Sequence, residues 1–370
     1  MRKFFHNTMG LITAGIAFVY LISCFSFIIP PAFFSPIALL GLAFPYLFVI
    51  VLVFCIINLF RDKKFALLLF VILLPGAYNF SHVFAFHFGK WKTEKAPNTL
   101  RVMTWNVEGY SMKGMRPEDI IVGILNTVKE YNPDIVFMQE NLARAWTSNR
   151  KWSKTDSLFN LIGYQGHYVV TDSTFWEGHM VSFNTGVALF SKTPITRDTA
   201  LRILEDPHEQ QHCIAGTTTF NNVPIRIMTA RLSSLNLYWD TAHQGKNIYQ
   251  ITFDRKRMVQ HQIRSVERLH EDQIKMIRQE IDASKDPVIY CGDMNSVPTS
   301  YNYYLMKSDN FQDAFLRGGG GIGATFHNIA PTLRIDAIFP DKKHFKVLQS
   351  KVIKVKLSDH YPVVADLQLK

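Results

Sequence analysis

Long stretches without charged residues dominate the first quarter of the chain. Gly10–Ile29 contains no charged residue and is followed by two prolines, and Pro36–Phe60 is a second uncharged run. About 20 apolar residues in a helix suffice to cross the hydrocarbon core of a bilayer, so both runs predict transmembrane helices. A cleaved signal peptide is the alternative for the first run, but the run is too long and no small-x-small cleavage site follows it. Phe65–Phe88 is a third apolar run, interrupted by a proline and polar residues, and is a further candidate span.

Basic residues around these runs predict their orientation. They lie at the N-terminus and after the second run, whereas the loop between the first two runs has none: Arg2, Lys3, Arg61, Lys63 and Lys64. Because Lys and Arg favour the cytoplasmic side, the first two runs are expected to form a hairpin with both ends in the cytoplasm. The rest of the chain is then extracytoplasmic if the third run spans, and cytoplasmic if that run lies in the interface. Lys90, Lys92 and Lys95 oppose export, but we expect the extracytoplasmic side.

After Pro97 the pattern changes to short β-prone runs mixed with amphipathic segments. Helical spacing of apolar residues predicts helices over Glu118–Tyr131 and Asp254–Ile281, the second of which is long enough to be broken once. The predicted strands are Leu100–Val107, Ile135–Met138, Thr185–Phe190, Ile225–Ala230, Val288–Cys291, Leu333–Phe339 and Val363–Leu369. Strands and helices do not alternate strictly, which favours a layered α+β sandwich over a parallel doubly wound sheet. The glycine run Gly318–Gly323 predicts a flexible loop.

The chain is therefore expected to divide into a membrane region, residues 1–96, and a folded domain, residues 97–370. Composition agrees with this division, because 48% of the 370 residues are hydrophobic and only 19% are charged, which excludes a disordered chain. The net charge of +10 is weak evidence for nucleic-acid binding, because much of the excess borders the apolar region. The four cysteines have no paired spacing, which excludes a disulfide-stapled scaffold and a zinc ribbon.

Acidic and amide residues follow or flank several predicted strands. These residues are Asn106, Gln139, Glu140, Asp293, Asn295, Asp336, Asp359 and His360. Four of them have an ordinary structural explanation when taken alone: Glu140 as a helix N-terminal acid, Asp293 as an Asx-turn residue, Asp336 as a partner of Arg334, and His360 as a core histidine. Taken together, hard oxygen ligands at successive strand ends predict a site for Mg²⁺ or Mn²⁺.

Six segments, in this order, resemble the endonuclease/exonuclease/phosphatase superfamily. They are TWNV, QE, TGVALFSKTPI, GDMN, RIDAIF and SDHYP, and the resemblance covers Leu100–Lys370. The resemblance implies a four-layered α/β sandwich with two packed mixed β-sheets, a divalent metal that is usually Mg²⁺, and hydrolysis of phosphoesters. Membrane-anchored members of the superfamily exist, so the apolar N-terminal runs agree with it.

The resemblance also implies roles for individual residues. Glu140 is the principal metal ligand, Asn106 assists at the metal or the phosphate, and Asp359 contributes to the metal site. Asp293 orients or deprotonates the attacking water, with Asn295 beside it. His360 contacts the scissile phosphate and is steadied by Asp336.

The chain departs from the family after the strand IRIMTA, where the sequence reads TARLSS and Arg231 stands in place of the usual histidine. Arginine cannot exchange a proton near neutral pH, but it can bind phosphate oxygens through two parallel hydrogen bonds. Arg231 is therefore expected to stabilise charge in a metal-dependent phosphoesterase. The alternative is a non-catalytic scaffold that binds phosphate or metal on the same fold.

Two classes of substrate remain open at this point. A basic and aromatic cluster after Glu140 is typical of a groove for nucleic acid: Arg144, Trp146, Arg150, Lys151, Trp152 and Lys154. Phe175–Trp176 and Leu235–Trp239 instead suit a phospholipid substrate, because apolar loops can enter a bilayer. Membrane anchoring favours the lipid by concentrating the enzyme at its surface.

Overall fold

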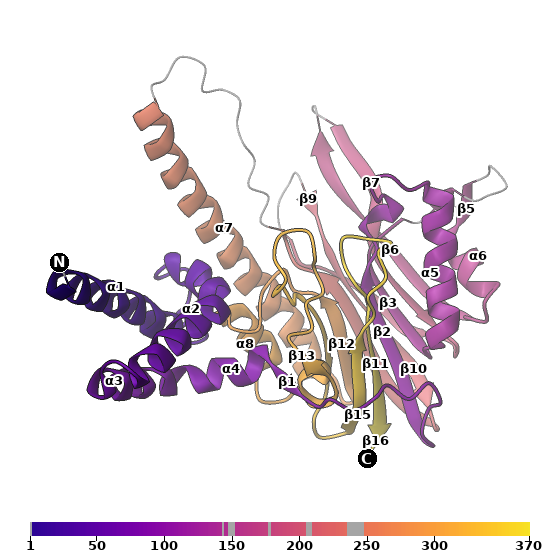
Figure 1. Ribbon diagram of the computed structural model, residues 1–370. Helices are drawn as coiled ribbons and strands as arrows, with labels where there is room; N and C mark the ends of the chain where they lie inside the picture. Colours follow the sequence, from indigo (N-terminus) through magenta and orange to yellow (C-terminus); the bar gives the residue numbers. More distant parts are fainter. Residues whose placement is uncertain (1, 143, 147–151, 177–178, 205–208, 235–247) are drawn as a thin grey trace. The chain divides into compact units, whose positions relative to one another are not determined.

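The computed structural model describes residues 2–142, 144–146, 152–176, 179–204, 209–234 and 248–370 (Figure 1). They form two compact units. The first unit comprises Met1–Val83, Ser233–Glu271 and Ser296–Leu305, and the second comprises Phe84–Leu232, Asp272–Asn295 and Met306–Lys370. We describe each unit by itself.

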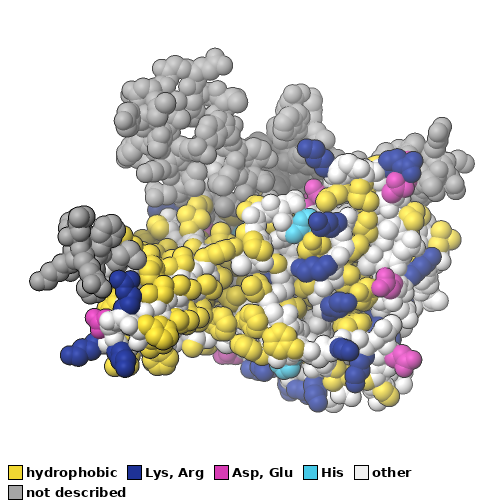
Figure 2. Space-filling view, in the orientation of Figure 1, with side chains coloured by type: hydrophobic (Ala, Val, Ile, Leu, Met, Phe, Trp, Pro, Cys, Tyr) yellow, Lys and Arg dark blue, Asp and Glu magenta, His cyan; other side chains and the backbone are white. Residues whose placement is uncertain are grey.

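The first unit contains the apolar helices. Helix α1 spans Arg2–Ser23, α2 spans Pro36–Leu59, α3 spans Lys63–Leu73, and α4 spans Ala77–Val83 after a short 3₁₀ turn, η1, at Leu74–Gly76. Within the described residues, two helical segments are long and apolar enough to cross a membrane: the 24 residues of α2 and the 21 residues from Lys63 to Val83. Their outward side chains are largely apolar, and Figure 2 shows them as a yellow surface.

Two details of the apolar runs differ from the sequence prediction. Helix α1 ends at Ser23 rather than near Ile29, and its apolar part, Gly10–Ser23, is shorter than a typical span. The third run is helical only to Val83, but Pro75 does not end it. Proline is tolerated there because it occupies the first turn of η1, where its missing N–H is not needed.

A segment from the C-terminal half of the chain belongs to the same unit. The hydroxyl of Thr299 donates to the carbonyl of Gly41 at 2.8 Å, and the hydroxyl of Ser26 donates to the carbonyl of Thr299 at 2.7 Å. The rings of Phe27 and Tyr304 pack with centroids 5.0 Å apart. The apolar helices are therefore fastened to the segment that immediately follows the GDMN motif.

The second unit is built on two mixed sheets. The seven-stranded sheet has the order β15 (Phe345–Val352), β16 (Val363–Leu369), β2 (Thr99–Asn106), β3 (Ile135–Leu142), β7 (His179–Ser191), β6 (Gly166–Trp176) and β9 (Glu209–Gln210). The five-stranded sheet has the order β14 (Asp336–Pro340), β12 (Val288–Asp293), β11 (Val223–Arg231), β10 (His212–Phe220) and β8 (Thr196–Arg202). The pairs β2–β3 and β11–β12 are parallel and the other pairs within these two sheets are antiparallel.

The two sheets pack face to face, and helices cover their outer faces (Figure 1). Alternate apolar side chains of both sheets form one buried cluster that includes Val102, Phe137, Ile227 and Ile289. On the other face of the seven-stranded sheet, helix α5 (Pro117–Tyr131) buries Ile120, Ile121, Ile124 and Val128. The expected sandwich of two mixed sheets is present.

The remaining elements are short, apart from one long helix. Helix α7 (Ile248–Ala283) is unbroken and longer than predicted, whereas α6 (Thr155–Asn160), α8 (Tyr301–Lys307) and α9 (Ala314–Gly318) are brief. The 3₁₀ turn η2 covers Glu108–Tyr110, and β4 (Arg144–Trp146) pairs with β5 (Trp152–Lys154).

The prediction of a flexible glycine loop was wrong. Part of the run forms β13 (Gly320–Gly321), which pairs with β1 (Ala85–Phe86) directly after the apolar helices. A Cβ added to Gly318 would lie 2.7 Å from the backbone of Gln349, so glycine permits this close approach. The predicted strand Leu333–Phe339 also begins later, at Asp336.

Candidate active site

A β-bulge sets the direction of the Glu140 side chain. The register between β3 and β7 shifts between Gln139 and Asn141, and Glu140 has a φ of +50°. A bulge leaves one residue out of the ladder and redirects its side chain. Strand β3 therefore continues past Met138, where the sequence predicted its end. Glu140 lies inside the strand, as the residue that the bulge leaves unpaired, and not after the strand.

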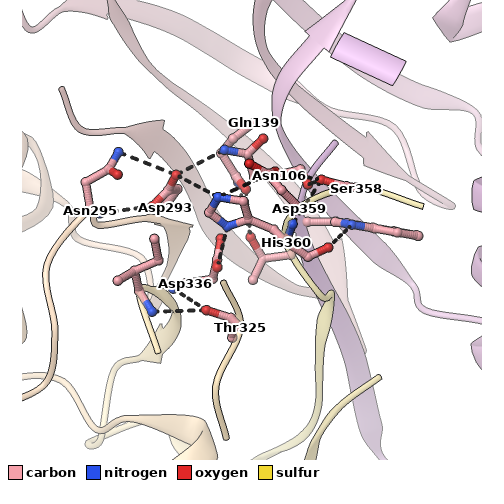
Figure 3. Close-up of polar contacts among 12 residues, drawn as sticks. Asn106, Gln139, Asp293, Asn295, Thr325, Asp336, Ser358, Asp359 and His360 are labelled. Atoms are coloured by element: carbon pink, nitrogen blue, oxygen red, sulfur yellow. Dashed lines mark hydrogen bonds and ion pairs between the residues drawn. The ribbon is translucent and has the colours of Figure 1, made fainter. Parts of the chain in front are cut away.

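Asn106, at the end of β2, connects the two sheets. Its amide nitrogen Nδ2 donates to Glu140 Oε1 at 2.9 Å and to Asp293 Oδ2 at 3.0 Å (Figure 3). Its Oδ1 accepts the backbone N–H of Glu108 at 3.1 Å, and its carbonyl accepts the hydroxyl of Ser358 at 2.8 Å. Asn106 is 1% exposed, so these contacts fix its position.

Asp293 ends β12 in the other sheet, facing Asn106. Its Oδ1 accepts the backbone N–H of Asn295 at 2.9 Å, and Asn295 Nδ2 donates to the carbonyl of Leu232 at 2.7 Å. Burial raises the pKa of Asp293 to about 6, although the nearby His360 opposes that rise. Asn295 thus ties the Asp293 carboxylate to the chain that leaves β11.

His360 forms a buried pair with Asp336. His360 Nδ1 lies 2.8 Å from Asp336 Oδ2, and His360 Nε2 lies 3.9 Å from carboxylate oxygens of both Asp293 and Asp359. Burial alone lowers the pKa of His360, but Asp336 and Asp293 outweigh it and raise the pKa to about 10. These carboxylates therefore favour the protonated form of the imidazole. Asp336 does not pair with Arg334, which binds Asp313 instead.

Glu108 is a fifth acid of this region, and sequence reasoning missed it. Its Oε2 accepts the backbone N–H of Asp359 at 3.1 Å, and its backbone has a φ of +47°. Burial raises its pKa, and the charges of Asp359 and Glu140 add to the rise. Burial also raises the pKa of Asp359, with Glu140 contributing. The sequence signal was present in TWNVEG, where an acid stands two residues after Asn106.

Arg231 lies at the end of β11, beside Asp293 in the parallel ladder. Its Nε is 2.8 Å from Glu140 Oε1, and both side chains are about one-quarter exposed. The guanidinium therefore points toward the acids rather than away from them.

These donors fit a hard dication. Burial raises the pKa values of Glu108 and Asp359, and repulsion from neighbouring carboxylates, including Glu140, adds to the rise. A bound Mg²⁺ or Mn²⁺ would offset both effects, because it supplies positive charge beside these oxygens. A second set consists of Asp293, Asp336 and His360, whose ligand atoms lie within 4.8 Å of one another. In that set, His360 Nδ1 already pairs with Asp336 Oδ2, so only Nε2 of the imidazole is left for another ligand.

Several predicted substrate contacts lie outside the described residues. Arg150, Lys151 and the whole of Leu235–Trp239 are among them, as are the side chains of Arg144, Trp146, Trp152, Phe175 and Trp176. Lys154 is described and is exposed.

Comparisons with known proteins agree with the fold. The family model "Endonuclease/Exonuclease/phosphatase family" matches residues 103–360, and a domain of unknown function matches residues 2–83. A search of curated proteins returns no significant match.

Three solved structures illustrate the likeness. An endonuclease/exonuclease/phosphatase from Beutenbergia cavernae is 20% identical, with a TM-score of 0.52, and the match covers 74% of this chain and 72% of that one. The human Nocturnin catalytic domain with bound sulfate is also 20% identical, with a TM-score of 0.50 and coverage of 74% and 94%. A functionally unknown protein from Enterococcus faecalis is 14% identical, with a TM-score of 0.50 and coverage of 73% and 100%. The matching family model spans more than half of the sequence, and the chain belongs to the endonuclease/exonuclease/phosphatase family, whose members are phosphoesterases and nucleases.

Proposed function

We propose that this protein is a membrane-anchored phosphodiesterase that depends on a divalent metal. One observation carries the proposal: the amide of Asn106 joins Glu140 of one sheet to Asp293 of the other, beside the buried His360–Asp336 pair. An ordinary surface has no reason to bury this many charged groups together, since each costs desolvation energy. Such clusters are typical of catalytic sites.

Glu140 and Asp359 would hold the metal, with Asn106 and Glu108 assisting. A dication held there would supply Lewis-acid chemistry, and these residues would place it beside the phosphoryl oxygens. The protein contributes rigidity, because the bulge fixes Glu140 and the Ser358 and Glu108 contacts fix the loop that carries Asp359.

Asp293 is the residue that would orient and deprotonate the attacking water. Its carboxylate is held from two directions by Asn106 Nδ2 and the N–H of Asn295. A carboxylate fixed in this way keeps one lone pair aimed at the water, which lowers the entropy cost of reaching the transition state.

His360 and Arg231 would bind the non-bridging oxygens of the phosphate. Asp336 holds the imidazole by Nδ1, which leaves Nε2 as a donor on the side that faces Asp293. The Arg231 guanidinium adds a second cationic donor near Glu140. Preorganised donors of this kind stabilise the additional charge that the equatorial oxygens carry in the transition state.

Arg231 also underlies the competing proposal, a non-catalytic scaffold. Its ion pair with Glu140 leaves the guanidinium pointing at the acids, which suits phosphate binding without turnover. Turnover by the natural chain supports catalysis. An inactive chain that becomes active on Arg231→His supports the scaffold.

The anchor is assigned to α2 and to the segment Lys63–Val83, which make the protein multi-pass. Their lengths suit a bilayer, and apolar side chains such as Phe60, at 87% exposed, face outward from this unit. We place the catalytic unit on the extracytoplasmic side. Arg61, Lys63 and Lys64, at the turn between the two segments, favour the cytoplasm, and the Lys63–Val83 segment then leads outward.

The direct test measures hydrolysis of bis-p-nitrophenyl phosphate by the full chain in detergent, with and without Mg²⁺ or Mn²⁺. Activity that requires metal, and that falls at least 100-fold in Glu140→Ala and His360→Ala, is expected, since each variant removes a metal ligand or a charged donor. Glu118→Ala, in helix α5, and His344→Ala, whose imidazole pairs with Asp341, serve as matched controls. Plasmid DNA and phospholipid vesicles, compared at equal enzyme, then distinguish nucleic-acid and lipid substrates.

A further inference from the structure

A cavity of about 1190 Å³ is lined by none of the residues assigned to catalysis. Its walls come from the segment His87–Glu94, from the glycine run at Gly318–Gly323, and from β15. The first wall follows directly after the apolar helices in the chain. The cavity therefore needs an explanation of its own.

The segment that follows the apolar helices is held firmly against the sandwich. The backbone N–H of His87 donates to the carbonyl of Gly319 at 3.0 Å, next to the β1–β13 pair. Farther along, the amide of Gln349 makes two hydrogen bonds of 2.9 Å with the backbone of Lys92, one as acceptor and one as donor. The backbone from His87 to Lys92 is thus a fixed wall rather than a loose linker.

Trp91 fixes the same wall from inside. Its ring lies under the guanidinium of Arg101, 4.9 Å from ring centroid to Cζ, and its centroid is 6.1 Å from that of Tyr131. These contacts hold Trp91, and the two hydrogen bonds from Gln349 hold the backbone of Lys92. The backbone that carries Lys90 and Lys92 is therefore fixed in position.

The charges around the cavity favour an anion. Four lysines line it, Lys90, Lys92, Lys351 and Lys354, against the acids Glu94, Glu130 and Asp366. Asp366 is neutralised by a buried ion pair with Arg101 at 2.6 Å, so the acids that remain are outnumbered by two to one. Among the described residues, the ammonium groups of Lys90 and Lys92 have no hydrogen-bond or ion-pair partner, and both residues are exposed.

The position of this wall in the chain indicates where the anion comes from. Six residues separate Val83, the end of the last apolar helix, from Lys90. Two of them, Phe86 and Phe88, are 59% and 70% exposed. Figure 2 shows Lys and Arg side chains lying among hydrophobic ones over the region of β1, β13 and β15. Exposed aromatic rings followed by lysines are typical of a segment at a membrane interface.

We propose that this cavity binds the phosphate headgroup of an anionic phospholipid of the membrane that holds the helices. Lys90 and Lys92 pair with the phosphate, Lys351 contributes from β15, and Phe86 and Phe88 contact the acyl-chain boundary. The proposal rests on the membrane anchoring proposed above and is independent of catalysis.

The test uses the full chain in a neutral detergent and measures thermal unfolding while dihexanoyl-phosphatidylglycerol is added below its micellar concentration. We expect saturable stabilisation that weakens as salt is raised, with dihexanoyl-phosphatidylcholine giving little. Lys90→Gln/Lys92→Gln should weaken the apparent affinity about tenfold or more, because it removes two cations that pair with the phosphate. Lys113→Gln/Lys285→Gln, which alters two exposed lysines elsewhere, should bind as the natural chain does.

Three results would overturn the proposal. Equal stabilisation by the zwitterionic lipid would mean that only the acyl chains are bound. Equal stabilisation by inorganic phosphate or glycerol 3-phosphate would indicate a small-anion site instead of a lipid site. An equal loss of affinity in Lys113→Gln/Lys285→Gln would show that the effect depends only on net charge. A chain that stays soluble after detergent removal would instead contradict the membrane anchoring. This result distinguishes an error in the anchoring proposal from an error in the proposed lipid site.

Discussion

Arg231 Nε lies 2.8 Å from Glu140 Oε1, so the residue that departs from the family pattern contacts the residue proposed as principal metal ligand. The two come from different sheets, β11 and β3, and their pairing brings a permanent cation to the position where the family usually has a titratable imidazole. Arginine and a dication then compete for the same carboxylate, while the guanidinium remains available for phosphate oxygens.

Arg231→Met should separate these two effects. Removing the competing guanidinium is expected to lower the metal concentration needed for half-maximal activity, whereas loss of a charged donor should lower kcat by about 100-fold. Metal titrations of phosphodiester hydrolysis provide both quantities. Arg116→Met, which breaks an exposed pair with Asp119, is the control. If neither the metal dependence nor kcat changes in Arg231→Met, Arg231 takes no part in the site.

Asp336→Asn should damage both turnover and stability. It leaves a buried imidazole facing a neutral amide, and breaking a buried pair costs about 3–5 kcal/mol. The matched control is Asp341→Asn, because Asp341 makes the same kind of pair with the more exposed His344, at 2.7 Å. Exposed pairs contribute at most about 1 kcal/mol. Similar losses in the two variants, by denaturant unfolding and kcat, would contradict a special role for the buried pair.

Glu108→Gln tests the acid that sequence reasoning did not find. We expect the metal concentration for half-maximal activity to rise about 10- to 100-fold, with kcat at saturating metal close to the natural value, since neighbours of metal ligands act mainly on affinity. Glu118→Gln, ten residues later, should change neither. A fall in kcat without any change in metal dependence would place Glu108 outside the metal site.

His270 should make stability depend on pH. It is 1% exposed, its Nε2 lies 2.5 Å from the carbonyl of Ser233, and burial lowers its pKa to about 4. The unfolded chain takes up this proton near pH 6.5, so stability is complete above that pH and falls as pH drops toward 4, by about 3 kcal/mol in total. His270→Gln should flatten that part of the unfolding profile, whereas His344→Gln should not. Parallel profiles for the natural chain and His270→Gln would show that the histidine does not titrate as described.

Gly318→Ala should destabilise the wall of the cavity lined by His87–Glu94, the glycine run and β15. Its Cβ would lie 2.7 Å from the backbone of Gln349, and forcing an atom into packed structure typically costs about 1–3 kcal/mol. Gly89→Ala is the control, because a Cβ there meets no atom within 4 Å. Equal melting temperatures for the two variants would refute the close approach.

Periodicity was enough to predict the centres of the main elements. Apolar spacing predicted α5 well. Local residues also mark both of its ends, since Pro117 begins the helix and Asn132, with a φ of +48°, ends it. Strands were predicted too short wherever polar residues continue a ladder, as in β3 beyond Met138. Hydrogen bonds to a neighbouring strand, which no local pattern contains, keep those residues extended.

Within the site, motif order suggested which residues to examine, but not their contacts. Nothing in the spacing of QE shows that Glu140 sits on a bulge, because the bulge depends on the partner strand β7. The pairing of the glycine run with Ala85–Phe86 was unpredictable for the same reason, since it joins segments more than 200 residues apart. Glu108 was missed because its role depends on the loop that carries Asp359.

The hydrogen bonds between Thr299, Gly41 and Ser26 have a practical consequence for anyone shortening this protein. Deleting everything before residue 97 would remove the apolar helices, yet it would also strip the chain just beyond Asn295 of the partners that now bury it. Thr299 is 1% exposed in the intact chain. Enzymology on such a fragment would sample a loosened loop beside Asp293, so detergent-solubilised protein is the proper starting material.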